Sequence, residues 1–178
     1  MLGVEFRVFD VDLDESALEK EDPAAYVVRV ARAKAETAAA RLAEGTLVLA
    51  ADTCVSVAGA IYGKPRDAAE AYAMLGVLSA RWHDVHTAVA LGTRAVLAVE
   101  LVHTRVKFRA LDAVTVASYW ASGEAADKAG AYGIQGLAGS FVERIDGSYS
   151  AVVGLPLAET LALFDRFGVA HALRGART

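Results

Sequence analysis

One carboxylate directly follows the most apolar run of this chain. Residues 47–51 are all hydrophobic, Gly45 precedes them, and Asp52 comes next. A short, continuous apolar run is typical of a strand buried on both faces, as in a parallel sheet. Open α/β sheets bind ligands beyond the carboxyl ends of such strands, where a carboxylate can hold a divalent cation or accept a proton from water. A turn-forming aspartate explains the position equally well, so position alone leaves the role of Asp52 open.

Two lysines are candidates for binding an anion. Val27, Val30 and Lys34 are spaced i, i+3 and i+7, so they share one face of the first expected helix. An ammonium group on an apolar face either snorkels to water, which is the commoner case, or points into a polar cleft. Lys64 lies in a Gly-Lys-Pro loop between an expected hairpin and a helix. Binding groups concentrate in such loops, although most loop lysines are simply solvated.

Glycine recurs at every third position from residue 130 to residue 136. Glycines allow positive φ angles and a close approach of the backbone to a ligand, but a structural turn explains them equally well. The stretch matches neither GxGxxG nor GxxxxGK[ST]. Gln135 lies within it, and its amide offers one acceptor and two donors that can recognise a base edge.

The overall charge argues against a general nucleic-acid-binding protein. The net charge is −4, with 18 basic and 22 acidic residues and no basic stripe. A phosphate-bearing ligand is therefore expected to be small and bound by a few placed cations. His83 and His86 are three residues apart in an expected strand, so they face opposite sides and make a poor metal pair.

The remaining sequence features predict a cytoplasmic protein without a membrane segment. The chain contains no apolar run of the ~20 residues that a span requires, and its N-terminus lacks the apolar region of a signal peptide. Cys54 is the single cysteine, which agrees with a reducing compartment. A lone cysteine on a strand is most often a small core residue.

Strands and helices alternate along the 178 residues, which are enough to bury a core. Asp22 with Pro23 predicts the start of a helix that extends to about residue 44. Asp67 with Glu70 predicts a second helix that extends to about residue 78. A hairpin around Gly59, strands at 83–91, 95–108 and 140–145, and helices at 112–120 and 156–167 complete the pattern. We therefore expect an α/β fold with a mixed, twisted sheet flanked by helices.

Several short motifs together resemble the Maf family of nucleoside triphosphate pyrophosphatases. Each motif is weak alone, but the ordered set covers nearly the whole chain. The resemblance implies one Maf-like domain over residues 1–178, two-lobed with a central cleft, and a possible homodimer. The motifs are Tyr26-Val27-Val28-Arg29 through Lys34-Ala35, Ala51-Asp52-Thr53, Gly63-Lys64-Pro65-Arg66-Asp67-Ala68, Met74-Leu75, His83-Asp84-Val85 with Thr87-Ala88-Val89, Asp127-Lys128-Ala129-Gly130-Ala131-Tyr132-Gly133-Ile134-Gln135-Gly136, Gly147-Ser148-Tyr149 and Val152-Val153-Gly154-Leu155-Pro156.

The family hydrolyses the α–β phosphoanhydride of noncanonical or pyrimidine nucleoside triphosphates with a divalent metal such as Mg²⁺ or Mn²⁺. The resemblance implies that Asp52 is the proton acceptor and a possible metal ligand. It implies that Lys34 and Lys64 neutralise the phosphates and that Glu15 is a further acidic residue, which we assign to the metal. Thr53 and Gln135 match the positions that separate the subtypes and indicate the dTTP/UTP pyrophosphatase branch. A glutamine amide can pair with N3–H and O4 of uracil or thymine, but a flipped amide also accepts cytosine.

The resemblance begins at Leu2-Gly3-Val4, just beyond a Ser-x-Ser-Pro-Arg-Arg loop with which family members grip the phosphates. No Ser-Pro-Arg-Arg sequence occurs in this chain. Either the loop lies upstream of Met1 in the full-length protein, or it has been lost. Its loss would remove two guanidinium groups from the phosphates and expose a sheet edge. The alternatives are thus a pyrophosphatase for 7-methyl-GTP or another modified nucleotide, a low-activity nucleotide-binding or division-regulating protein, and a purely structural dimer.

Overall fold

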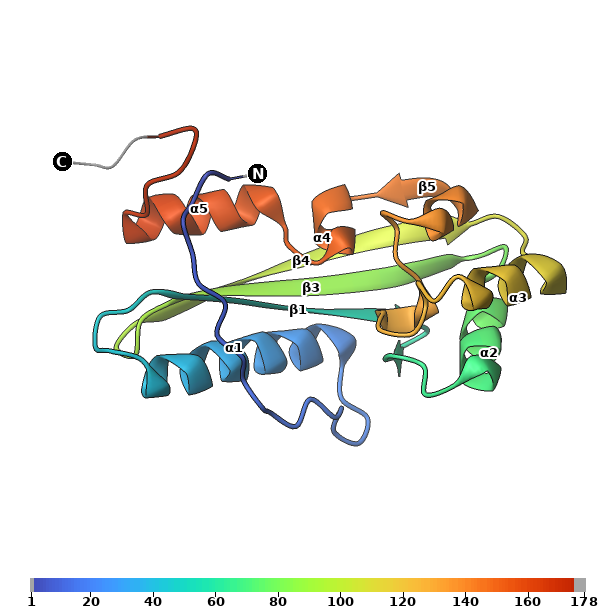
Figure 1. Ribbon diagram of the computed structural model, residues 1–178, viewed down its shortest axis with the longest axis horizontal. Helices are drawn as coiled ribbons and strands as arrows, with labels where there is room; N and C mark the ends of the chain where they lie inside the picture. The colour runs from blue at the N-terminus through green and yellow to red at the C-terminus, as the bar shows by residue number, and fades with distance from the viewer. Residues whose placement is uncertain (1, 175–178) are drawn as a thin grey trace.

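The computed structural model describes residues 2–174, which form one five-stranded sheet in the order β2-β1-β3-β4-β5. The α/β class and the helices on both sheet faces are confirmed (Figure 1). A mixed sheet was expected, but every described pairing between these strands is antiparallel. The strands are β1 (Val48–Val57), β2 (Ala60–Tyr62), β3 (Trp82–Gly92), β4 (Leu97–Phe108) and β5 (Val142–Asp146).

The expectation that residues 47–51 are buried on both faces is wrong in part, because Val48 is buried whereas Leu47 and Leu49 are 39% and 40% exposed. Helix α1 (Pro23–Arg41) packs on one face of the sheet, and α5 (Leu157–Phe167) lies over the other (Figure 1). The placement of Asp52 at a strand end is also wrong. Because the hairpin to β2 extends β1 to Val57, Asp52 lies in the middle of the strand, opposite Ala88 of β3.

Three predicted helix starts are confirmed by side-chain caps. Asp22 accepts from the first-turn amides of α1, Asp67 caps α2 (Ala68–Leu78), and Asp112 caps α3 (Ala113–Ala121). Such caps satisfy amides that lack a partner within the helix. Helix α4 (Tyr149–Val153) was not expected; Ser148 caps it, and Gly154 ends it with a φ of 117°. None of the described helices combines the length and apolarity needed to cross a bilayer.

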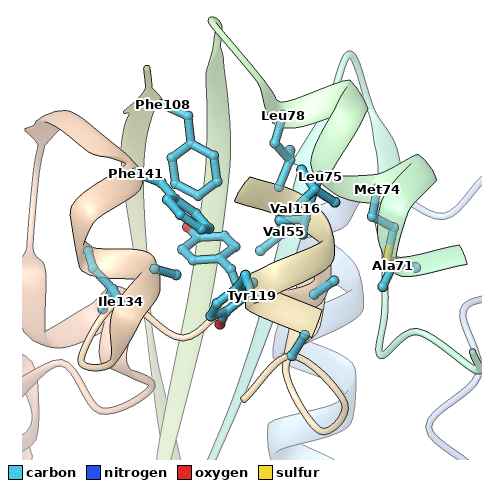
Figure 2. Close-up of a cluster of buried hydrophobic side chains, with 14 of the residues drawn as sticks. Val55, Ala71, Met74, Leu75, Leu78, Phe108, Val116, Tyr119, Ile134 and Phe141 are labelled. Atoms are coloured by element: carbon cyan, nitrogen blue, oxygen red, sulfur yellow. The ribbon is translucent and has the colours of Figure 1, made fainter. Parts of the chain in front are cut away.

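A large hydrophobic cluster lies at the end of the sheet where β3 begins and β4 ends. It packs α2 and α3 against Val55 and Phe108, together with the segment that contains the 3₁₀ helices η1 (Ala129–Ala131) and η2 (Leu137–Phe141). Figure 2 shows the Phe108, Phe141 and Tyr119 rings of this cluster, which meet edge to face. Two smaller clusters lie under α1 and under α5. Helices α1 and α5 therefore pack on the middle of the sheet, and the large cluster packs at the end where β3 begins and β4 ends.

His83 makes the stability of this cluster sensitive to acid. Its side chain is buried against Phe108 and Tyr132, and its Nε2 atom lies 2.9 Å from the Tyr132 hydroxyl. Burial lowers the pKa of His83 to about 4, whereas an unfolded histidine has a pKa of about 6.5. The unfolded state therefore takes up the proton at a higher pH than the folded state does. As the pH falls from about 6.5 to about 4, the protein loses ~3 kcal/mol of folding stability in total.

Urea unfolding at a series of pH values in this window measures the effect. We expect the free energy of unfolding of His83→Gln to depend less steeply on pH than that of the wild type. His103→Gln is the matched control, because His103 is a half-exposed imidazole on the opposite face of the sheet. Equal slopes for the wild type and His83→Gln would contradict this account of His83.

Candidate active site

Three of the predicted site residues form one ion cluster on the α1 side of the sheet. The Lys34 ammonium lies 2.8 Å from Asp52 Oδ1 and 3.0 Å from Glu15 Oε2. Lys34 comes from α1, Asp52 from β1 and Glu15 from the N-terminal segment, which crosses from the α5 side of the sheet to α1 (Figure 1). Lys34 therefore points into a polar site and does not snorkel to water, which was the commoner reading of its helical spacing.

The cluster holds a protonated lysine between two carboxylates. Burial raises the pKa of Asp52, while the hydrogen bond and charge of Lys34 act in the opposite direction. Burial by itself would lower the pKa of Lys34, but the hydrogen bonds to Asp52 and Glu15 raise it above its usual value. Burial and the two carboxylates raise the pKa of Tyr26 to about 12, so its hydroxyl stays protonated and donates to the Glu15 carbonyl at 2.9 Å. The cluster therefore contains one fixed positive charge.

One oxygen of Asp52 is buried without a hydrogen-bond partner in the described part of the chain. Oδ1 accepts from Lys34, so this oxygen is Oδ2. Such an orphaned acceptor suits a cation or a water molecule, because leaving it unpaired costs free energy. Residues 2–174 contain no group of three His, Cys, Asp or Glu side chains that could hold a metal. Mg²⁺ is often held by one or two carboxylates together with substrate phosphates, and Asp52 with Glu15 fits that pattern.

A cavity of about 420 Å³ on the other face of the sheet contains the remaining predicted residues, Thr53, Lys64 and Gln135, in its lining. Ligand cavities commonly measure ~300–1,000 Å³. The Gly130 amide donates to the Gly63 carbonyl at 3.0 Å, which joins the loop of Lys64 to the glycine-rich stretch of Gln135.

Gly130 is required where this wall meets β1. Its φ is +66°, and a Cβ atom there would lie 2.9 Å from Val55 Cβ, so only glycine fits without displacing β1. The glycine period in the sequence thus has a structural cause at this position. The neighbouring Ile134 packs in the large hydrophobic cluster (Figure 2), and this anchors the exposed Gln135 at the cavity.

Asp52 and Thr53 face opposite sides of the sheet because side chains alternate along a strand. Strand β2 pairs only with residues 55–57, so no described strand pairs with residues 48–54 on that edge of β1. The ion cluster and the cavity therefore lie on either side of an edge of β1 that no described strand pairs with. Lys64 is close to both. It lines the cavity, and its charge lowers the pKa of Asp52, although more weakly than Lys34 does.

Two residues around the cavity were given no role in the sequence analysis. Glu124 accepts from the Leu137 amide at 2.8 Å, and its carboxylate lies where a side chain on Gly136 would have to be. Thr87 is fully buried opposite Thr53. A glutamate in a Ser-Gly-Glu turn and a threonine in a strand carry no local signal, since their partners lie far away in the sequence.

The prediction that Cys54 is a core residue is confirmed. It is buried under α1, where its thiol donates to the Pro23 carbonyl at 3.6 Å. Burial and the Asp52 charge raise the pKa of Cys54 to about 12. A buried thiol with a raised pKa is a poor nucleophile.

Comparison of the sequence with known proteins identifies the family of the chain. The family model described as Maf-like protein matches residues 1–167. The chain belongs to the Maf family. The cluster of Glu15, Lys34 and Asp52 and the cavity behind Thr53 are thus features of a Maf protein, and the resemblance inferred from the ordered motifs is confirmed.

Several Maf proteins named dTTP/UTP pyrophosphatase are similar to this chain. The protein from Methylobacillus flagellatus is 52% identical over 170 residues, which are 95% of this chain and 85% of the relative. The protein from Hahella chejuensis is 51% identical over 170 residues, covering 94% and 85% of the two chains. The protein from Escherichia coli O157:H7 is 49% identical over 176 residues, covering 99% and 88%.

Proposed function

We propose that this Maf protein hydrolyses dTTP and UTP to the nucleoside monophosphate and pyrophosphate. The observation that carries the proposal is the pairing of two half-sites across the β1 edge. On one side, a buried carboxylate has one unpaired oxygen next to a protonated lysine. On the other, a cavity with Gln135 and Thr53 in its lining is large enough for a nucleoside. The names of relatives about 50% identical to this chain support the same activity.

In this proposal the base lies in the cavity and the triphosphate crosses the unpaired edge of β1. Lys64 at the cavity and Lys34 behind the edge neutralise the phosphate oxygens. Asp52 Oδ2 accepts a proton from water as the water oxygen bonds to the α-phosphorus. The bond from that phosphorus to the α–β bridging oxygen breaks, and pyrophosphate leaves.

We further propose that Asp52 and Glu15 hold a divalent cation such as Mg²⁺ or Mn²⁺ together with the substrate. Such an ion supplies positive charge to phosphate oxygens when bound. The ion pairs of Lys34 keep both carboxylates next to each other before the substrate arrives. A homodimer and a cytoplasmic location remain predictions from the resemblance and the composition.

A panel of nucleoside triphosphates tests the function. We expect pyrophosphate release from dTTP and UTP with kcat/KM at least about tenfold above that for 7-methyl-GTP, since recognition of a base by placed polar groups is worth this much. Chelation with EDTA should abolish turnover, and Mg²⁺ or Mn²⁺ should restore it. A preference for 7-methyl-GTP would replace the substrate assignment. Tight binding of dTTP without pyrophosphate release would instead favour a low-activity nucleotide-binding protein.

A further inference from the structure

A short chain of hydrogen bonds runs from the cavity into the protein behind Thr53. The Thr53 hydroxyl lies 3.0 Å from the Thr87 hydroxyl, which in turn lies 2.8 Å from the Ala151 carbonyl oxygen. Thr53 is partly buried at the cavity, whereas Thr87 and Ala151 are fully buried. The chain connects neighbouring strands of the sheet to α4, the short helix that lies over them.

Only one arrangement of protons satisfies both contacts. Each threonine hydroxyl has one proton to donate and two lone pairs to accept, and the Ala151 carbonyl can only accept. If Thr87 donated to Thr53, two acceptors would face each other at 2.8 Å between Thr87 and Ala151. Thr87 therefore donates to Ala151, and Thr53 must donate to Thr87.

This arrangement leaves Thr53 with no proton for a ligand. Its hydroxyl presents only lone pairs to the cavity, so it can bind a hydrogen-bond donor but not an acceptor. Gln135, the other polar residue expected to read the base, can rotate its amide to offer either a donor or an acceptor. Discrimination between bases then depends on Thr53, whose direction of donation is fixed by a residue that does not touch the ligand.

We propose that Thr87 is a positioning residue that makes the cavity prefer uracil and thymine over cytosine. Ring N3 of uracil and thymine carries a hydrogen and donates to Thr53, which leaves O4 for the amide of Gln135. N3 of cytosine is an acceptor and faces the lone pairs of the Thr53 hydroxyl. The inference rests on the proposed hydrolysis of dTTP and UTP and names the residue behind its selectivity. A site built to pair with one polar group rejects a ligand that leaves the group unpaired.

Thr87→Val tests the proposal because valine keeps the shape and removes the hydroxyl. The Ala151 carbonyl keeps the hydrogen bond from the Gly154 amide at 2.9 Å, so no buried acceptor is left without a partner. The Thr53 proton becomes free to turn toward cytosine N3. We expect the ratio of kcat/KM for UTP to kcat/KM for CTP to fall by about tenfold, since one hydrogen bond is worth about this factor. Thr87→Ala makes the same test with a smaller side chain should the valine variant fold poorly.

Two controls separate the hydrogen bond from packing. Thr87→Ser keeps the hydroxyl and should keep the wild-type ratio, whereas an equal fall in Thr87→Ser and Thr87→Val would overturn the proposal. In a Thr53→Val background, Thr87→Val should change the ratio no further, because its effect passes through the Thr53 hydroxyl. A ratio near one in the wild type, or an unchanged ratio in Thr87→Val, would also overturn it.

The outcomes distinguish this inference from the proposed function. If the wild type prefers UTP and Thr87→Val keeps the same UTP-to-CTP ratio of kcat/KM, the proposed function stands and the positioning role of Thr87 is wrong. A protein without turnover loses the proposed function, but the same ratio can be measured from the Kd values of UMP and CMP by calorimetry. If the wild type binds UMP more tightly than CMP and Thr87→Val does not, the positioning role of Thr87 is supported even in a protein that does not catalyse hydrolysis. Equal Kd ratios in the two proteins would overturn that role.

Discussion

The Asp52→Asn variant is expected to hydrolyse dTTP at least ~100-fold more slowly than the wild type at saturating Mg²⁺, the usual cost of losing a general base or a charge-stabilising group. Asparagine keeps the size of the side chain and an oxygen for Lys34, but it cannot take up the proton of the attacking water. Its amide also presents a donor where the unpaired Oδ2 now lies. Initial rates of pyrophosphate release at saturating dTTP and Mg²⁺ measure the effect on kcat.

Asp84→Asn is the matched control for this substitution. Asp84 lies on β3 and contacts His103 at 2.7 Å without lining the cavity. Its asparagine variant should keep kcat within about twofold, as surface substitutions away from a site usually do. If Asp52→Asn retained most of the activity under these conditions, Asp52 would be neither the base nor a required metal ligand. The binding residues would then have to act without it.

Local signals in the sequence were enough to place α1, α2, α3 and α5, but not the short helix α4. Asp22, Asp67 and Asp112 cap the first three within the first turn, and a cap is a contact between residues two or three positions apart. Strand direction was not accessible in this way. The apolar run before Asp52 suits a parallel or an antiparallel neighbour equally, and it did not reveal that Leu47 and Leu49 stay partly exposed.

The sequence proposed residues for the candidate site one by one, but it did not predict their geometry. The helical spacing placed Lys34 on the buried face of α1, yet its partner Asp52 is 18 positions away and cannot be read from periodicity. Because β1 was expected to end at residue 51, the alternation that separates Asp52 from Thr53 was not seen. Thr87 and Ala151 are 64 positions apart, so the hydrogen-bond chain that fixes Thr53 exists only in the folded protein.

Lys34→Met is expected to lower kcat/KM for dTTP by about 100-fold, because it removes a charge that neutralises phosphate oxygens and holds the ion cluster together. It should also change the pH dependence. Asp52 must be ionised to accept a proton, so the rate falls as the pH drops through its pKa. Burial raises that pKa and Lys34 counteracts the rise. Without Lys34 the pKa rises further, and the acid limb of the kcat/KM profile moves to higher pH.

The direction of this shift separates two roles that Lys34 could have. A lysine that only binds phosphate would raise KM in its methionine variant and leave the acid limb where it is. Lys64→Met should raise KM with a smaller shift of the acid limb than Lys34→Met, because Lys64 is exposed and affects the pKa of Asp52 less than Lys34 does. Lys107→Met, which breaks a surface ion pair with Glu143, should change neither quantity. An acid limb that stays fixed in Lys34→Met would mean that the ionisation of Asp52 does not control the rate, and the proton acceptor would have to be sought elsewhere in the site.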